Sequence, residues 1–394
     1  RGTGASSDAI SVNSTDGTCT ASITNNLSNR NLVVNGAMQI SQYAEYDGTT
    51  THGRGAVDRW AHYRENVDEN PTFSQGDVAS GTTPYELGFR KSLKTVNGNQ
   101  TSGAGADDYI SYDYKWEAQD IADSGWNYTS TSSYLTFSFW VKSSVAQNFY
   151  FYIKTSDGTA QNYPMETGSL SANTWTKITK QIPGNSNLQF DHDRNEGLQL
   201  RIILYRGTNK TGSITLNQWA AWNTNVRVPD NTTTWYTTND ATFEITGVQL
   251  EVDHTGSGVA TAFEHRTFGD ELARCQRYYY RHAFGNQAAP YQMPGNNSHP
   301  VGMCAIYTAS SGFGYIQFPV TMRTQPTLDV ATGTGYYIIY ANNGTDKFND
   351  LAQQQYGTTN AVVNYYDGFS KDTGHAGWIQ LSNANAYIAF SAEL

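Results

Sequence analysis

The stretch FEITGVQLEVDHTGSGVATAFEHRTFGDELARCQRYYY, residues 243 to 280, decides the fold because several structural periods follow one another in it. Its first part alternates apolar and polar residues as a half-buried strand does, and Gly247 interrupts the alternation between Ile245 and Val248 as a β-bulge would. The glycines at 256 and 258 then supply a turn. We expect one large β domain before this stretch and a smaller one after it.

A short amphipathic helix is predicted within residues 267 to 282. Leu272, Cys275 and Tyr279 recur at i, i+3 and i+7, which places them on one face of a helix. Glu271 lies in the first turn, where the helix dipole favours an acidic side chain. We therefore expect a helix that links the two β domains and turns its apolar stripe, including Tyr279, toward a core.

The composition favours β structure and argues against several functions. Charged residues make up only 15% and aromatic residues 13% of the chain, and Thr, Asn, Ser and Gly are abundant. A formal charge of −10 argues against nucleic-acid binding. Cys19, Cys275 and Cys304 form neither an even set nor a CxxC pair, so we expect no disulfide framework and no metal site. No apolar run reaches the roughly 20 residues of a membrane helix, so we expect no membrane insertion.

Residues 31 to 266 have the pattern of a jelly-roll β-sandwich. Asn35 and Gly36 form a strong turn pair. Apolar residues alternate with polar or amphipathic ones at 135–141, at 149–153 and again at 198–204. Many short strands joined by Gly and Asn turns predict two stacked sheets with one buried face each.

Residues 283 to 394 predict a second, smaller β-sandwich with long polar connections at 286–300, 341–360 and 367–377. Aromatic side chains in such connections suit sugars, because a flat ring with a polar edge can stack on the CH face of a sugar ring. The alternative is that they pack loops or an interface between copies. The candidate receptor-binding residues are Tyr291, Tyr356, Tyr365, Tyr366 and Trp378.

Two local clusters are candidates for chemistry, and neither predicts catalysis. Glu117 and Asp120 have the residue types of a glycosidase pair, but their sequence separation does not set the required distance in space. Asp191, His192 and Asp193 are consecutive in a segment rich in turn formers, which favours a solvated loop. We expect a protein that is not an enzyme.

Several motifs resemble the C-terminal part of receptor-binding tail-fibre proteins of tailed bacteriophages, particularly those of marine and cyanobacterial phages. The resemblance implies a homotrimeric, non-enzymatic head on the virion, joined through residues 1 to 30 to an upstream fibre shaft. It also implies a bacterial surface glycan or protein as the receptor. The matching segments are GVQLE, FEHR and ELARCQRYYYR within the stretch above, NRNLVVNGAMQISQ at 29–42, VDRW at 57–60, TFSFWVKSS at 136–144 and FPVTMRTQPT at 318–327.

The larger domain also resembles the jelly-roll carbohydrate-binding modules of polysaccharide-degrading enzymes. In those modules carboxylates at the start and end of the domain hold a structural calcium ion. Gln39 and Thr246-Gly247 stand at the corresponding positions here, so the resemblance implies no calcium, and we expect no cofactor. Two alternatives stay open: the carbohydrate-binding end of a polysaccharide depolymerase, and a structural virion decoration protein.

Overall fold

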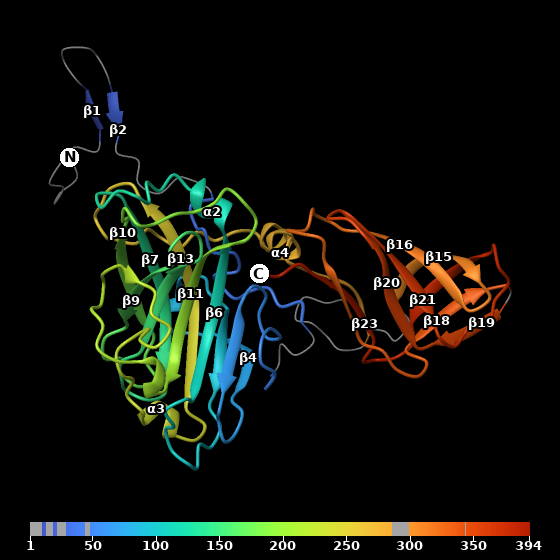
Figure 1. Cartoon of the computed structure of the whole chain (residues 1–394), viewed down its shortest axis with the longest axis horizontal. Helices are drawn as coiled ribbons and strands as arrows, with labels where there is room; N and C mark the ends of the chain where they lie inside the picture. Colours follow the sequence, from blue (N-terminus) through green and yellow to red (C-terminus); the bar gives the residue numbers. More distant parts are fainter. Residues whose placement is uncertain (1–9, 13–18, 22–28, 44–47, 286–298, 343) are drawn as a thin grey trace.

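The computed structural model describes two β units joined by one helix (Figure 1). We call the larger unit, up to residue 266, the body and the smaller one, from residue 279 onward, the tip. The expected fold class, mainly β with two sandwiches, is confirmed. The described residues are 10–12, 19–21, 29–43, 48–285, 299–342 and 344–394.

The body stacks two antiparallel sheets, with strand orders β10-β7-β13-β5-β4 and β12-β9-β8-β11-β6-β3. Its strands are β3 (Ala61–Glu65), β4 (Thr72–Asp77), β5 (Lys91–Val96), β6 (Tyr109–Glu117), β7 (Tyr134–Ser143), β8 (Tyr150–Thr155), β9 (Gln161–Glu166), β10 (Thr176–Pro183), β11 (Glu196–Arg206), β12 (Ala220–Ala221) and β13 (Thr242–Asp253). The short helices are α1 (Thr83–Glu86), α2 (Ala118–Ala122), η1 (Thr208–Lys210) and α3 (Thr234–Thr237). Upstream, β1 (Ile10–Val12) pairs with β2 (Cys19–Ala21).

The tip has a seven-stranded sheet, β19-β18-β22-β15-β16-β21-β20, and a three-stranded sheet, β14-β23-β17. The expected connection at 341–360 is wrong, because it contains two paired strands whose outward positions are polar. The strands are β14 (Tyr279–Phe284), β15 (Pro300–Thr308), β16 (Ser311–Gln317), β17 (Thr327–Val330), β18 (Tyr337–Ala341), β19 (Gly344–Phe348), β20 (Asp350–Tyr356), β21 (Asn360–Tyr366), β22 (Ala376–Leu381) and β23 (Tyr387–Ser391).

The alternating segments of the body supply its core. Phe137 and Phe139 on β7 meet Phe151 on β8, with ring centroids 5.8 and 5.3 Å from that of Phe151. All three rings are fully buried. Burying such a side chain contributes roughly 1.5 to 3 kcal/mol, so the aromatic alternation holds the two sheets face to face.

The helix α4 (Phe268–Gln276) joins the body to the tip (Figure 1). Thr267 caps its first turn, because the threonine hydroxyl oxygen accepts a hydrogen bond from the Asp270 N–H at 3.3 Å. The predicted helix is confirmed in position but not in its full extent, since Tyr279 already begins β14. No helix among the described residues is long and apolar enough to cross a membrane.

The buried side of α4 differs from the predicted stripe. Glu271 and Cys275 are its buried residues, whereas Leu272 is only half-buried. Glu271 accepts a hydrogen bond from the Asn35 N–H and lies 3.3 Å from a guanidinium nitrogen of Arg266. The periodicity of apolar residues did not predict this face, because a carboxylate is buried there with one partner nearby in the chain, Arg266, and one distant partner, Asn35.

Gly247 forms the predicted bulge in β13. The register between β13 and β7 shifts between Thr246 and Gln249, and Gly247 has φ +62°. A Cβ at this position would lie 2.6 Å from the Phe89 ring. Beyond the bulge, the Val248 N–H donates to the carbonyl of Gly36 at 2.9 Å, so the opening segment of the body closes on β13.

The substitution Gly247→Ala should lower the free energy of unfolding by roughly 2 to 4 kcal/mol, because it combines left-handed strain with overpacking against Phe89. Chemical denaturation of both proteins measures the difference. Gly269→Ala is the matched control: no atom lies within 4 Å of the added methyl group, and alanine favours a helix. Equal losses in the two variants would contradict the account of the bulge.

His62 on β3 is a buried imidazole in the body. Its Nε2 lies 2.8 Å from the Thr51 carbonyl oxygen, and its ring stacks on Phe73 at 4.1 Å. Burial lowers the pKa of His62 to about 4. The unfolded chain takes up this proton near pH 6.5, so the unfolded state binds more protons between the two values and stability falls as the pH falls.

His62 should therefore remove roughly 2 kcal/mol of unfolding free energy between pH 7 and pH 5. His62→Gln keeps an N–H donor for Thr51 but has no titrating ring, so its stability should depend less steeply on pH. Denaturant unfolding at both pH values tests this, with His254→Gln as the control at an exposed position. If His62→Gln and the wild type lose the same stability, the neutral buried imidazole is not the cause.

Candidate functional site

The residues predicted to bind a receptor lie on strands of the tip, not in loops. Tyr356 ends β20, Tyr365 and Tyr366 end β21, and Trp378 lies within β22. Their expected position in loops is therefore wrong, because the polar residues around them are the outward positions of paired strands. Tyr291 lies outside the described residues.

Tyr356 and Tyr365 point into the core of the tip. Tyr365 is 1% exposed and packs over Gly314, where an added Cβ would lie 2.5 Å from its ring. Burial raises the pKa of Tyr365. Tyr356 packs edge-on against Phe390, with ring centroids 6.0 Å apart. Tyr365 is thus out of reach of a receptor in this fold, and the alternation Ala361-x-Val363-x-Tyr365 was the sequence signal for its inward position.

Trp378 and Tyr366 point the other way, to the outer face of the seven-stranded sheet. Trp378 is 40% exposed and stands directly opposite Met303 on β15 and Tyr340 on β18, which are 54% and 42% exposed. Directly opposite residues on neighbouring strands share a face and lie about 5 Å apart. These three side chains therefore form one continuous row across β18, β22 and β15.

A second group continues this surface over β15, β16 and β21. The ring of Tyr307 lies 5.0 Å from that of Phe313, and Tyr315 is 59% exposed. The hydroxyl of Tyr366 donates to Asp350 at 2.9 Å. We call the whole surface the aromatic face; its residues are Met303, Tyr307, Phe313, Tyr315, Tyr340, Tyr366 and Trp378.

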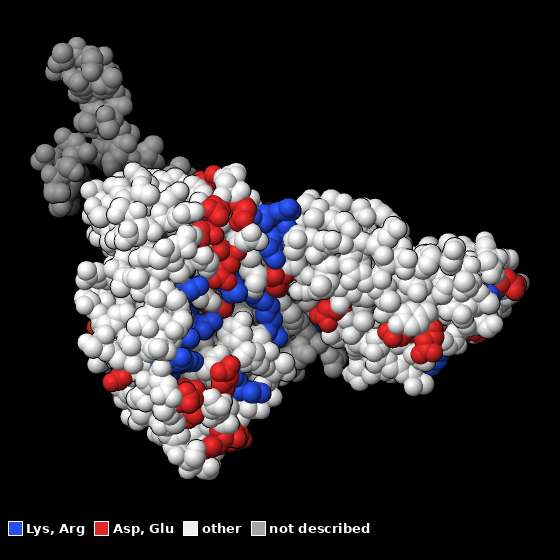
Figure 2. All heavy atoms as spheres, viewed as in Figure 1, with Lys and Arg blue, Asp and Glu red and all other residues white. Residues whose placement is uncertain are grey.

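The aromatic face is uncharged at its centre. The strands β15, β16, β18 and β22 contain no Asp, Glu, Lys or Arg, and Figure 2 shows little charge over the part of the tip where Figure 1 labels β15, β16 and β21. Five of the large hydrophobic side chains that are most exposed in the described chain belong to it: Met303, Tyr307, Tyr315, Tyr340 and Trp378. An exposed apolar patch of this kind marks a binding surface. Sequence analysis missed all of these except Trp378, although the alternation Met303-x-x-x-Tyr307 and Phe313-x-Tyr315 was visible.

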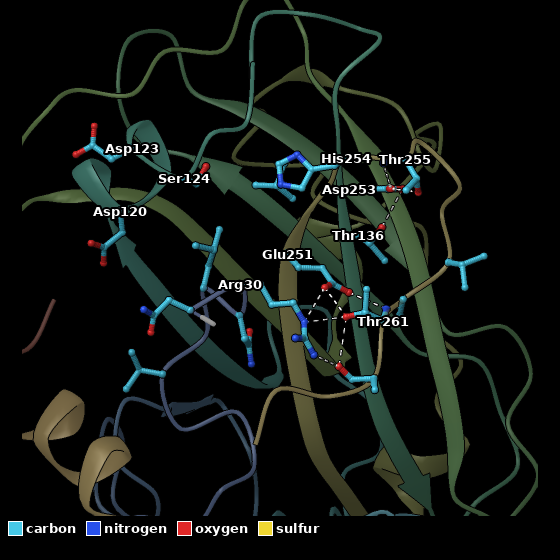
Figure 3. Close-up of a pocket in the computed structure, with 18 of the residues that line it drawn as sticks. Arg30, Asp120, Asp123, Ser124, Thr136, Glu251, Asp253, His254, Thr255 and Thr261 are labelled. Atoms are coloured by element: carbon cyan, nitrogen blue, oxygen red, sulfur yellow. Dashed lines mark hydrogen bonds and ion pairs between the residues drawn. The ribbon is translucent and has the colours of Figure 1, made fainter. Parts of the chain in front are cut away.

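A separate cleft of about 960 Å³ lies in the body beside α2 and the end of β13 (Figure 3). Two of its carboxylates, Glu251 and Asp253, have partners within the fold. Glu251 lies 3.4 Å from Nε of Arg30 and accepts from the Thr261 hydroxyl at 2.6 Å, and Asp253 accepts from the Gly258 N–H at 2.8 Å. These contacts occupy the acidic groups in stabilising turns, so we assign no ligand to this cleft.

The cleft also contains Asp120, one of the two carboxylates considered as a catalytic pair. Burial, followed by repulsion from Glu117, raises the pKa of Asp120 to about 6. Glu117 itself is fully buried and accepts two hydrogen bonds from Arg277, at 2.8 and 2.7 Å, and one from the Tyr278 hydroxyl at 2.6 Å. Glu117 therefore holds the body to the end of α4, and both of its oxygens are engaged in these bonds.

The other suggested clusters are separated or internally bonded. His192 lies 2.7 Å from the Asp123 carboxylate, and both side chains are exposed. The Asp193 carboxylate accepts from the Asn195 N–H at 2.9 Å. At the positions compared with calcium ligands, the Thr246 hydroxyl donates to the Lys91 carbonyl at 2.7 Å. Within the described ranges, no group of three or more His, Cys, Asp or Glu residues is arranged to hold a metal ion.

Comparison with known proteins gives weak structural similarities. No family model matches the sequence, and no curated protein matches it. The enzymatically active domain of tailspike protein 4 of bacteriophage CBA120 aligns at 10% identity and TM-score 0.30, over 57% of this chain and 22% of that one. This chain thus spans about a fifth of that protein.

Carbohydrate-binding modules align over a similar share of this chain. A family 4 module gives 12% identity and TM-score 0.28 over 56% of this chain and 98% of its own. The family 11 module of Clostridium thermocellum, in complex with a β-1,3-1,4-mixed-linked tetrasaccharide, gives 15% identity and TM-score 0.24 over 52% of this chain and 91% of its own. We draw no functional conclusion from alignments at these scores.

Proposed function

We propose that this chain is the non-catalytic adhesive head of a phage tail fibre, and that it holds a bacterial surface glycan on the aromatic face of its tip. The single observation that carries the proposal is the row of exposed side chains Tyr340, Trp378 and Met303 on three neighbouring strands. A flat, apolar and uncharged platform with hydroxyl groups at its edge matches the CH faces and hydroxyl edges of neutral sugar rings.

The platform is suited to adhesion because strands, not loops, hold it. Beneath it, Ile339, Ile379 and Cys304 are buried on the opposite side of the same strands, so the outer side chains start from a fixed backbone. Preorganised rings lose little entropy on binding. In a homotrimer of the chain, three such faces would engage a polymeric glycan together, and modest affinity per face would give firm attachment through effective concentration.

The proposal also states that the chain binds the glycan without cleaving it. Its support is that Glu117 is committed to Arg277 and Tyr278 and that the His192 pair is exposed to solvent. A captured glycan should be recovered from the protein at unchanged length. Shortened fragments would instead support the alternative, a part of a polysaccharide depolymerase.

The substitution Trp378→Ala should weaken binding to the glycan at least tenfold, equivalent to about 1.4 kcal/mol, because it removes the central ring of the row. Tyr340→Ala should also weaken binding to the glycan. The measurement is binding of the purified protein to a panel of bacterial surface polysaccharides and to the corresponding cells. Unfolding temperatures should stay the same, since both side chains project from the sheet.

Leu87→Ala is the control, because it shortens another exposed apolar side chain on the body and should leave binding unchanged. A second use of the aromatic face would be contact between copies of the chain. Measuring the molar mass in solution distinguishes this use from glycan binding. If Trp378→Ala converts oligomers into single chains while glycan binding per chain persists, the face is an interface. If no polysaccharide binds at all, a structural decoration protein becomes the better account.

A further inference from the structure

The outer face of the six-stranded sheet in the body carries a group of arginines that has no role in the adhesive site on the tip. In Figure 2, Lys and Arg side chains, with Asp and Glu among them, lie over the part of the body where Figure 1 shows β11 and β6. Arg201 and Arg206 project from β11, and Arg227 belongs to the segment that crosses this sheet. Carboxylates pair with Lys115, Lys154 and Arg201 on this sheet, so Arg206 and Arg227 are the cations that stand out in a chain whose formal net charge is −10.

The fold fixes the position of each arginine through aromatic rings. The guanidinium carbon of Arg206 lies 4.3 Å from the centroid of the Tyr109 ring, and that of Arg201 lies 5.3 Å from the centroid of Tyr63. The guanidinium carbon of Arg227 lies 5.4 Å from the Trp222 ring. Cation–π contacts hold the planar groups in place, with Arg206 9% exposed and Arg201 and Arg227 partly exposed at the surface.

The segment that carries Arg227 is tied firmly to the sheet. The side chain of Asn162 on β9 donates to the Arg227 carbonyl at 2.9 Å, and the Arg227 N–H donates to the Lys210 carbonyl at 3.1 Å. Thr211 and Val228 form a parallel bridge at the base of the segment. The position of Arg227 beside the sheet is therefore part of the fold.

These arginines are poorly neutralised by the protein itself. Arg201 has one acidic partner, Asp113, with its nitrogen 3.4 Å from a carboxylate oxygen. Among the described residues, Arg206 and Arg227 have no carboxylate within 4.0 Å, and their guanidinium groups donate no hydrogen bond to the protein. Burial and then repulsion from Arg227 lower the pKa of Arg206, and Arg201 adds to the repulsion. Like charges held together at a cost are expected where an anion binds between them.

Other unpaired polar groups converge on the same face. The Ser111 hydroxyl and one carboxylate oxygen of Asp113 are buried without a hydrogen-bond partner in the described chain, as are the Nε atoms of all three arginines. Tyr152 stands directly opposite Arg201 and is 1% exposed; burial raises the pKa of its hydroxyl, and the three arginines oppose that rise. Unpaired buried groups cost about 1 to 3 kcal/mol each; an anion would pair with the arginine donors, and a sugar hydroxyl could donate to the Asp113 oxygen.

We propose that the outer face of the six-stranded sheet, around Arg201, Arg206 and Arg227, binds an acidic saccharide through its carboxylate or sulfate group. Planar guanidinium groups bind such anions with two parallel N–H bonds. Trp222, half-buried beside Arg227, offers a ring on which the adjoining sugar can stack. The small number of cations and the negative charge of the whole chain favour single anionic groups on a sugar over the dense phosphates of nucleic acid.

The test measures binding of the full chain to oligogalacturonate, to its neutral methyl ester, and to a sulfated galactan oligosaccharide with its desulfated counterpart. We expect the charged member of at least one pair to bind tenfold or more tightly than its neutral partner, with an affinity that falls as salt is added. The pair that shows the difference identifies the anion as carboxylate or sulfate. Equal binding of charged and neutral members in both pairs would overturn the proposal.

Arg206→Gln and Arg227→Gln should each reduce this binding at least tenfold, while Lys177→Gln, which removes an exposed charge on β10 of the other sheet, should not change it. The saccharide should raise the unfolding temperature of the wild type and not that of the arginine variants. If Arg206→Gln fails to fold, saccharide binding by Arg227→Gln, on the crossing segment, tests the proposal. Full binding by both variants, or equal binding of a single-stranded oligonucleotide, contradicts the assignment.

The site on the body is additional to the proposed adhesive site on the tip. Different variants test the two proposals, so one can be contradicted while the other holds. Trp378→Ala should keep the charge-dependent binding of the body, and Arg206→Gln should keep the binding of neutral glycan by the tip. If Trp378→Ala abolishes the charge-dependent binding as well, the acidic saccharide is held on the tip and the arginine face is not its site.

Discussion

The ion pair between the buried carboxylate of Glu117 and the partly exposed guanidinium group of Arg277 is the contact on which the arrangement of the molecule depends. Glu117 ends β6 of the body with no exposed surface, and Arg277 directly follows α4. A buried carboxylate costs several kcal/mol unless it is fully paired, and here both oxygens accept N–H bonds from one guanidinium group while one also accepts from the Tyr278 hydroxyl. The contact therefore joins the body to the end of α4, directly before the first strand of the tip.

A second buried pair supports the first from the far end of the chain. The guanidinium group of Arg59 lies 3.4 Å from the centroid of the Tyr278 ring, and it donates to Glu393. Arg323 donates to the carbonyls of Ala392 and Glu393 within the tip, at 2.7 and 2.9 Å, and to the Arg194 carbonyl of the body at 2.8 Å. The last strand of the tip is thus tied back to the body, which fixes the tip as a projecting unit (Figure 1). The aromatic face and the arginine face lie on different sheets of this one assembly.

Sequence patterns predicted those parts of the molecule that depend on neighbours along the chain. Alternation located the core strands of the body, and Gly247 marked the bulge. The same reasoning placed Tyr365 in a loop, because the Asn and Asp residues around it resemble turn formers; the pairing of β21 with β16 and β20 was needed to show its burial. The group of Arg201, Arg206 and Arg227 could not be predicted from the sequence, since the Arg227 segment reaches β9 only through tertiary contacts.

The central claim is that sugar rings lie on the aromatic face of the tip. The most direct measurement is a structure of the full chain with an oligosaccharide taken from the surface of a bacterium to which the protein adsorbs. The account predicts a sugar ring stacked on Trp378, with a neighbouring ring near Tyr340 or Tyr315. An oligosaccharide bound elsewhere while another copy of the chain covers Trp378 would contradict it.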